Sequence, residues 1–347
     1  MTTSAKRIVW IDIARGLGIL LVVYSHALRG LLHSGILSEN SLLAGSDYVV
    51  TTFRMPMFFF LAGLNVPRSL RKGPKIFAIN KLWTLYYAYL LWSYLQGGIQ
   101  YFFQAHLNSA RNLDELIRIP WQPMGQFWFL YCLLFCHAAA LLSKGRLKGL
   151  VPVSIVAFLL YGVTPLWFGY PFLNTEYMFI FYVAGIYLHR YDLSFPLRWK
   201  IFLPAVGGTA ALFTVAVTWG RTASRDIPFS YQSLPACILG ITIIFALSHL
   251  LSERTTLLRN IFSTLGKASM TIYVLHVITG SAARVVLKEM GVRNVTLLMI
   301  VVTVVGLYVP LLAQNIFARM HLLVALGLAS PQIPKPKTSP IVAEELE

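Results

Sequence analysis

Ten long apolar segments, separated by short polar gaps, constrain the fold of this chain more than any other sequence feature. A helix needs about 20 consecutive, mostly apolar residues to cross the hydrocarbon core of a bilayer. The pattern therefore predicts an all-α, polytopic integral membrane protein with about ten transmembrane helices. The predicted spans are residues 8–31, 48–66, 77–103, 124–142, 150–168, 174–189, 200–219, 232–251, 268–288 and 295–317.

The charge content agrees with a membrane protein and not with a soluble one. Only 12% of the 347 residues are charged and 57% are hydrophobic, whereas a typical soluble domain is about 25% charged. The net charge of +16 does not indicate nucleic-acid binding, because the basic residues occur in short clusters between apolar segments. This distribution is typical of membrane proteins, whose cytoplasmic loops are rich in Lys and Arg. We therefore expect membrane lipids, and no nucleic acid, as partners.

The same basic residues predict the orientation of the chain. If the N-terminus is cytoplasmic, ten spans place most of the 29 Lys and Arg residues on the cytoplasmic side, as the positive-inside rule requires. Both termini are then cytoplasmic, and the proline-rich residues 329–347 form a disordered tail. The first apolar segment lacks a small-residue cleavage site, so it is expected to remain as a helix. The three cysteines show no metal-ligand spacing, and we expect them to pack, with no metal site.

Three ionisable residues interrupt the first apolar segment: Asp12, Arg15 and His26. Charged groups are costly inside a bilayer, so each one is a candidate functional residue. Arg15 and His26 are eleven residues apart, which returns to nearly the same face of a helix about 16–17 Å further along. Asp12, three residues before Arg15, lies on that side as well. This helix is therefore predicted to carry a polar stripe, although an Asp12–Arg15 ion pair with a purely structural role is an alternative.

Three more ionisable residues lie in later spans. Arg54 is in the second span, Glu176 begins the sixth, and His276 is near the middle of the ninth. A structural role is the alternative for each of them: Glu176 as a charge of the outer loop, and His276 as a buried histidine with satisfied hydrogen bonds. Their coincidence favours a functional site more than any one of them does.

Five segments resemble the membrane-bound acyltransferase-3 family. Its hallmark is an arginine, ten residues and a histidine in the first helix, which Arg15 and His26 match in a D-x-x-R-G context. The other four segments, in the expected order, are RMPMFFFLAG from residue 54, GQFWFL at 125–130, FIFYVAGIYL at 179–188 and LGKASMTIYVLH at 265–276. The resemblance is to the branch that lacks an SGNH-type hydrolase domain, and it implies a single transmembrane acyltransferase domain over residues 1–328.

The resemblance implies an O-acyltransferase of the bacterial inner membrane, with acetyl-CoA as the donor. Acetyl, or alternatively succinyl, would be transferred from the cytoplasmic side to a hydroxyl of an exported or surface glycan or a lipid-linked sugar. His26 would act as the general base, with Arg15 and Asp12 completing the catalytic set and Asp12 a distant candidate to orient its ring. Arg54, Trp128, Glu176 and His276 would bind substrate. A transient acyl carrier is the alternative role for His26.

Two other functions remain open at the level of the sequence. Acyltransferases of the MBOAT type are also polytopic and use a histidine, but that residue lies late in the chain and not in the first helix. A transporter or flippase of a polyprenyl-linked sugar would line its path with Arg15, His26, Arg54 and Glu176. The absence of an internal sequence repeat argues against this second alternative.

Overall fold

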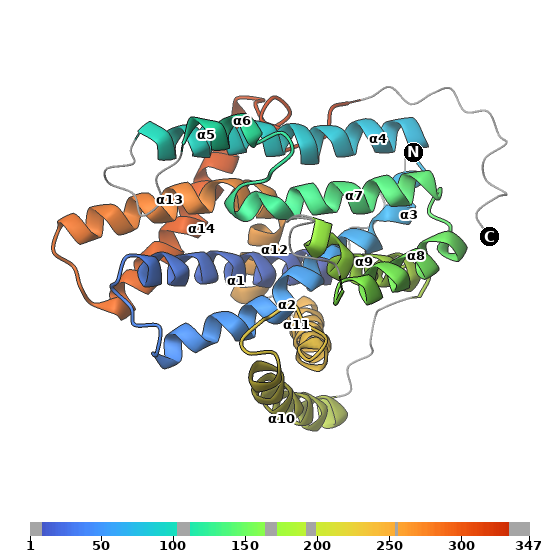
Figure 1. Ribbon diagram of the computed structural model, residues 1–347, viewed down its shortest axis with the longest axis horizontal. Helices are drawn as coiled ribbons and strands as arrows, with labels where there is room; N and C mark the ends of the chain where they lie inside the picture. Colours follow the sequence, from blue (N-terminus) through green and yellow to red (C-terminus); the bar gives the residue numbers. More distant parts are fainter. Residues whose placement is uncertain (1–8, 103–111, 164–171, 192–198, 254–255, 333–347) are drawn as a thin grey trace. The chain divides into compact units, whose positions relative to one another are not determined.

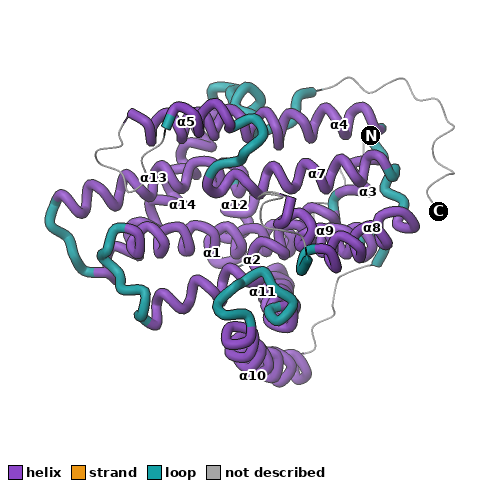
Figure 2. The backbone as a smooth tube through the Cα atoms, viewed as in Figure 1, coloured by secondary structure: helices purple, strands orange, loops and turns teal. Residues whose placement is uncertain are grey.

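A computed structural model describes residues 9–102, 112–163, 172–191, 199–253 and 256–332. All regular secondary structure in these ranges is helical (Figure 2), in agreement with the predicted all-α class. Each of the ten predicted spans contains a helix. Within the described ranges, the helices α6 (Leu113–Arg118) and α12 (Leu257–Lys267) lie wholly outside the predicted spans, and α3 (Val66–Leu70) lies outside them except for its first residue.

Six helical segments are long and apolar enough to cross a membrane, so the chain is a multi-pass membrane protein. They are α1 (Val9–His33), α2 with α3 (Leu42–Leu70), the segment Gly125–Leu142 that includes α7 (Trp128–Leu142), α11 (Leu234–Ser252), α13 (Ser269–Glu289) and α14 (Val295–Arg319). The count of ten spans and the cytoplasmic position of both termini stay predictions. Most of the predicted tail lies outside the described residues, which end at Gln332.

The chain divides into two compact units. The first comprises residues 1–58, 99–111 and 194–320, and the second comprises residues 59–98, 112–193 and 321–347. This division does not test the prediction of one transmembrane domain over residues 1–328, which stays a prediction.

Helix α1 is the central helix of the first unit. It packs against α11, α12, α13 and α14 (Figure 1), and α10 (Trp199–Ala223) packs against α11. Two glycines make the contact between α1 and α12 very close: a Cβ atom on Gly16 would overlap the carbonyl oxygen of Phe262, and one on Gly266 would overlap the carbonyl oxygen of Asp12. Because each glycine faces the backbone of the other helix, the two helices touch without intervening side chains.

The second unit contains a similar contact between the end of α2 and α9 (Phe172–Leu188). A Cβ atom on Gly63 would overlap the carbonyl oxygen of Tyr182, and one on Gly185 would overlap that of Phe60. Helix α9 also packs against α7 and α8 (Leu147–Leu160). Small residues at such crossings let helix backbones approach closely within membranes.

A strap formed by residues 321–328 runs along another helix of the second unit. That helix begins as α4 (Pro74–Lys81), continues through a π-helical turn at Leu82–Tyr87 and ends as α5 (Ala88–Phe102). Trp83 Nε1 donates to the carbonyl of Val324 at 2.7 Å, Tyr87 Oη to that of Ala325 at 2.8 Å, and Trp92 Nε1 to that of Leu326 at 3.0 Å. Three aromatic side chains thus hold three consecutive carbonyl groups.

Candidate active site

Two histidines from distant parts of the sequence meet in the first unit. The imidazole rings of His26 on α1 and His276 on α13 have centroids 5.0 Å apart and planes inclined at 64°, so they meet edge to face. The two residues have different predicted roles, and their separation of 250 residues in the sequence gives no indication of this contact. The packing of α13 against α1 brings them together.

The backbone fixes the tautomer of His276. Its Nδ1 lies 3.0 Å from the carbonyl oxygen of Ile272 and 2.8 Å from that of Tyr273. Because a carbonyl oxygen can only accept a hydrogen bond, Nδ1 carries the proton and Nε2 carries the lone pair. The residue is 2% exposed, and its Nε2 has no hydrogen-bond partner among the described residues. His276 therefore offers a buried, vacant acceptor.

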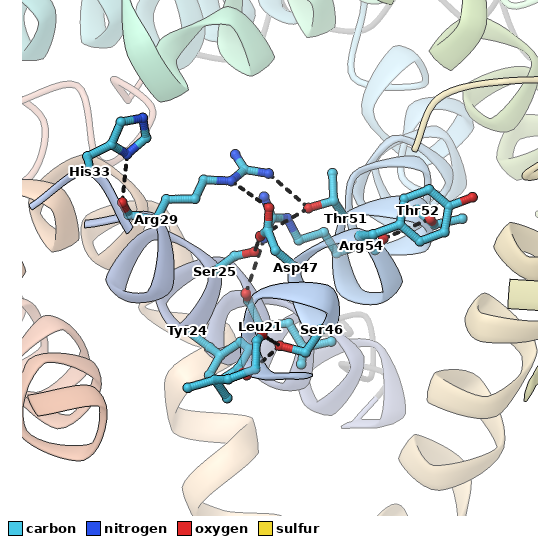
Figure 3. Close-up of polar contacts among 12 residues, drawn as sticks. Leu21, Tyr24, Ser25, Arg29, His33, Ser46, Asp47, Thr51, Thr52 and Arg54 are labelled. Atoms are coloured by element: carbon cyan, nitrogen blue, oxygen red, sulfur yellow. Dashed lines mark hydrogen bonds and ion pairs between the residues drawn. The ribbon is translucent and has the colours of Figure 1, made fainter. Parts of the chain in front are cut away.

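Arg54 on α2 supplies a buried cation to the same region. It is 3% exposed, and its Nη1 donates to the carbonyl of Leu21 on α1 at 3.4 Å (Figure 3). Its Nε is buried and has no partner in the described part of the chain. A buried guanidinium with a vacant donor is suited to an oxygen atom that develops negative charge.

A polar network links α1 to α2 beside His26 (Figure 3). Arg29 Nε donates to Asp47 Oδ2 at 2.8 Å, and Arg29 Nη2 donates to Thr51 Oγ1 at 3.0 Å. The hydroxyl of Ser25, the neighbour of His26 in sequence, donates to the other carboxylate oxygen of Asp47. This network therefore fixes α2 against the turn of α1 that carries His26.

Asp47 and its partners were not among the predicted site residues, because the predicted second span begins at residue 48. The helix begins earlier, at Leu42, so Asp47 lies within its second turn. The available signal was the spacing of Asp47 and Thr51, four residues apart and hence on one face of a helix that faces α1.

Asp12 and Arg15 lie at the other end of α1. Arg15 Nη1 is 4.0 Å from Asp12 Oδ1, at the limit of an ion pair, with the Asp12 side chain buried and that of Arg15 about one-third exposed. Because α1 is one continuous helix, Asp12 is about 21 Å along the axis from His26. Asp12 therefore does not orient the His26 ring directly. Because the helix is unbroken, Arg15 and His26, eleven residues apart, lie on nearly the same face of α1.

Trp128 and Glu176 belong to the second unit. Trp128 is the first residue of α7 and stands edge to face with Phe129, with ring centroids 6.5 Å apart. Just before it, buried Gln126 exchanges amide hydrogen bonds of 2.7 and 3.3 Å with Gln96 on α5. Glu176 is a partly buried residue near the start of α9. Their predicted roles in substrate binding stay predictions.

Comparison with known families decides the class of the protein. A family model described as an acyltransferase domain matches residues 8–314, which is most of the chain. The chain belongs to the membrane-bound acyltransferase-3 family. Searches of curated proteins and of solved structures found no match to this acyltransferase. The family match supports membrane acyl transfer to a hydroxyl group as its activity.

Several residues that carried the family resemblance now have a place in the structure of the acyltransferase. Gly16 and Gly266 form the contact between α1 and α12, and Gly63 and Gly185 form the contact between α2 and α9. His26, His276 and Arg54, from three separate motifs, gather in the first unit. The motifs therefore combine two kinds of residue, those that let helices touch and those that present polar groups.

Proposed function

We propose that the protein is an O-acetyltransferase of the bacterial inner membrane. It transfers acetyl, or in an alternative form succinyl, from acyl-CoA on the cytoplasmic side to a hydroxyl of a surface or exported glycan or of a lipid-linked sugar. The observation that carries the proposal is the contact between His26 and His276 in a chain of this family, with the buried Arg54 bonded to α1 in the same unit. The buried side chains of His276 and Arg54 each keep a vacant polar atom. Such atoms are costly to bury unless a ligand uses them.

In this proposal the length of α1 connects the two substrates. Arg15 holds the phosphates of the acyl-CoA at one end, since a guanidinium pairs well with phosphate oxygens. The thin pantetheine arm then covers the distance of about 16–17 Å to His26 along the helix. Asp12, held near Arg15, keeps that side chain in place.

His26 acts as the general base in the transfer step. A sugar hydroxyl becomes a strong nucleophile only as its proton is removed, and imidazole is suited to accept it. The hydroxyl oxygen attacks the thioester carbonyl carbon, and Arg54 donates to the oxygen that gains negative charge. The C–S bond then breaks, and the proton passes from His26 to the thiolate to give free CoA. Trp128 and Glu176 remain candidates for contacts to the acceptor.

An assay with radiolabelled acetyl-CoA tests the proposal. Membranes containing the protein are incubated with the surface glycan fraction of cells that lack the gene, and label on the glycan is measured. We expect transfer by the native protein and none by His26→Ala. Movement of sugar across the membrane that is independent of acetyl-CoA, together with unlabelled glycan, would instead establish the flippase alternative. Mass spectrometry of surface glycans with and without the gene then identifies the modified sugar.

A further inference from the structure

The proposed base lacks an orienting partner on its own helix. A neutral imidazole has one N–H and one lone pair, so a histidine acts as a base only when its N–H is held and its lone pair faces the substrate. Asp12 is about 21 Å from His26 along α1. Asp47, the nearest carboxylate of the network beside it, is already bonded to Ser25, Arg29 and Thr51.

His276 has the geometry that the orienting role requires. Its ring lies directly against that of His26, at 5.0 Å between centroids. Because both carbonyl groups of Ile272 and Tyr273 engage Nδ1, the ring of His276 cannot exchange its tautomer without losing these bonds. Its Nε2 is therefore an acceptor, and it is the only polar atom of the ring left without a partner within the described ranges.

We propose that His276 is a positioning residue, whose Nε2 accepts a hydrogen bond from the N–H of His26 during the reaction. This inference rests on the proposed function, and it assigns His276 a role in catalysis instead of one in binding substrate. In the structure the rings meet edge to face, and hydrogen bonds of catalytic groups commonly tighten only when substrate is present. Formation of this bond requires the His26 ring to turn its N–H toward Nε2 of His276.

The proton balance of the step follows directly. The His26 nitrogen that faces the acceptor takes the hydroxyl proton as the C–O bond forms, and the resulting imidazolium keeps its other N–H directed at His276 Nε2. The same proton then leaves with the sulfur atom as the C–S bond breaks. His276 stays neutral throughout, which suits a buried site that already contains the positive charge of Arg54. A carboxylate in that position would add a buried negative charge.

Two conservative substitutions separate the two nitrogen atoms of His276. The amide of an asparagine corresponds to Nδ1, whereas that of a glutamine reaches the position of Nε2. We expect His276→Asn to keep the bonds to the backbone but to lower kcat about 100-fold or more, with KM for acetyl-CoA changed less than about threefold. His276→Gln places an oxygen acceptor at the position of Nε2, so its kcat is expected to be at least about tenfold higher than that of His276→Asn.

The matched control is His249, a buried histidine of the same unit that stacks on Trp10 with ring centroids 4.6 Å apart. The variants His249→Asn and His249→Gln are expected to keep the native kcat, and thermal unfolding of all four purified proteins in detergent checks their folding. If His276→Asn transfers acetyl at the native rate while His26→Ala does not, the role of His276 is refuted and the proposed function stands. If His26→Ala is also fully active, the role of His26 as the base is refuted as well, whereas the absence of acetyl transfer by the native protein would refute the proposed function itself.

Discussion

Arg54 is the residue whose surroundings say most about the reaction. Its guanidinium is buried between α1 and α2, with one nitrogen bonded to a backbone carbonyl and Nε vacant. A fully paired arginine would be a structural cross-link, whereas a vacant buried donor is an energetic cost that a ligand must offset. In the proposed reaction, the partner of this donor is the thioester carbonyl oxygen.

Replacing Arg54 by lysine is expected to lower kcat by about 100- to 1,000-fold, the usual effect of losing one donor to a developing oxyanion. Lysine keeps the charge but not the planar set of donors. The rate of acetyl transfer to glycan measures the effect, and Arg293→Lys, at an exposed loop position, is the matched control. Equal activity of the two variants would show that Arg54 takes no part in the reaction.

Asp47 and Arg29 are predicted to contribute to stability as a coupled pair. Their side chains are 19% and 36% exposed, so the coupling free energy is expected to be modest, about 0.5–1 kcal/mol. Thermal unfolding of Asp47→Asn, Arg29→Gln and the double variant in detergent gives the value by a double-mutant cycle. Strictly additive effects would show that the ion pair adds nothing to the fold.

At the scale of whole helices, two pairs of glycines fix the crossings. The contacts of α1 with α12 and of α2 with α9 each place a glycine of one helix on the backbone of the other. Such a contact leaves no space for a methyl group, because its neighbour is a backbone carbonyl that belongs to a hydrogen-bonded helix. At these two crossings the helices therefore touch through their backbones, whereas side chains fill the space between helices elsewhere.

Gly16→Ala and Gly266→Ala are expected to lower the melting temperature by several degrees or to prevent folding, because either methyl group would overlap a carbonyl oxygen. Gly98→Ala provides the control, since a Cβ atom there meets nothing within 4 Å and alanine favours a helix interior by about 0.5–1 kcal/mol. Thermal unfolding compares the three. A Gly16→Ala protein as stable as the native one would contradict the close contact.

These helices also show what could be predicted from the sequence. Length and apolar content were sufficient to locate a helix within each predicted span and to predict a multi-pass membrane protein, because a bilayer requires about 20 apolar residues per crossing, whereas the count of ten crossings stays a prediction. Helix α12 was missed because its mixed composition resembles a loop, although Thr256, whose hydroxyl accepts from the amide of Arg259 at 3.2 Å, is a typical start signal. The pairing of His26 with His276 could not be predicted, since it depends on which helices pack together.

At the scale of the whole molecule, the number of membrane crossings determines which loops share a side. The three native cysteines are buried, so single engineered cysteines can report position. With ten spans, the cysteine of Ser38→Cys lies on the periplasmic side of the membrane and that of Lys148→Cys lies on the cytoplasmic side, and both positions are exposed. We expect a membrane-impermeant maleimide to label intact cells only at position 38.

Labelling of both cysteines from outside would show that one of the helices between them does not cross the membrane. The continuous helix from Pro74 to Phe102 is the one to reconsider in that case, because it is absent from the six long apolar segments. Detergent-treated cells, in which both positions must react, are the control for accessibility.

The strap over residues 321–328 has a consequence for how this protein can change over evolutionary time. Trp83, Tyr87 and Trp92 bond to carbonyl groups, which every amino acid possesses. These bonds consequently depend on the spacing of the carbonyl groups along the strap and not directly on the identity of its side chains. The side chains of Val324, Ala325 and Leu326 take no part in these bonds, whereas Gly327 is constrained, because its φ is 69° and a Cβ atom there would lie 2.8 Å from the Cβ atom of Ala88. Insertion or deletion of a single residue before Val324 would shift all three carbonyl groups relative to the aromatic side chains that bond to them.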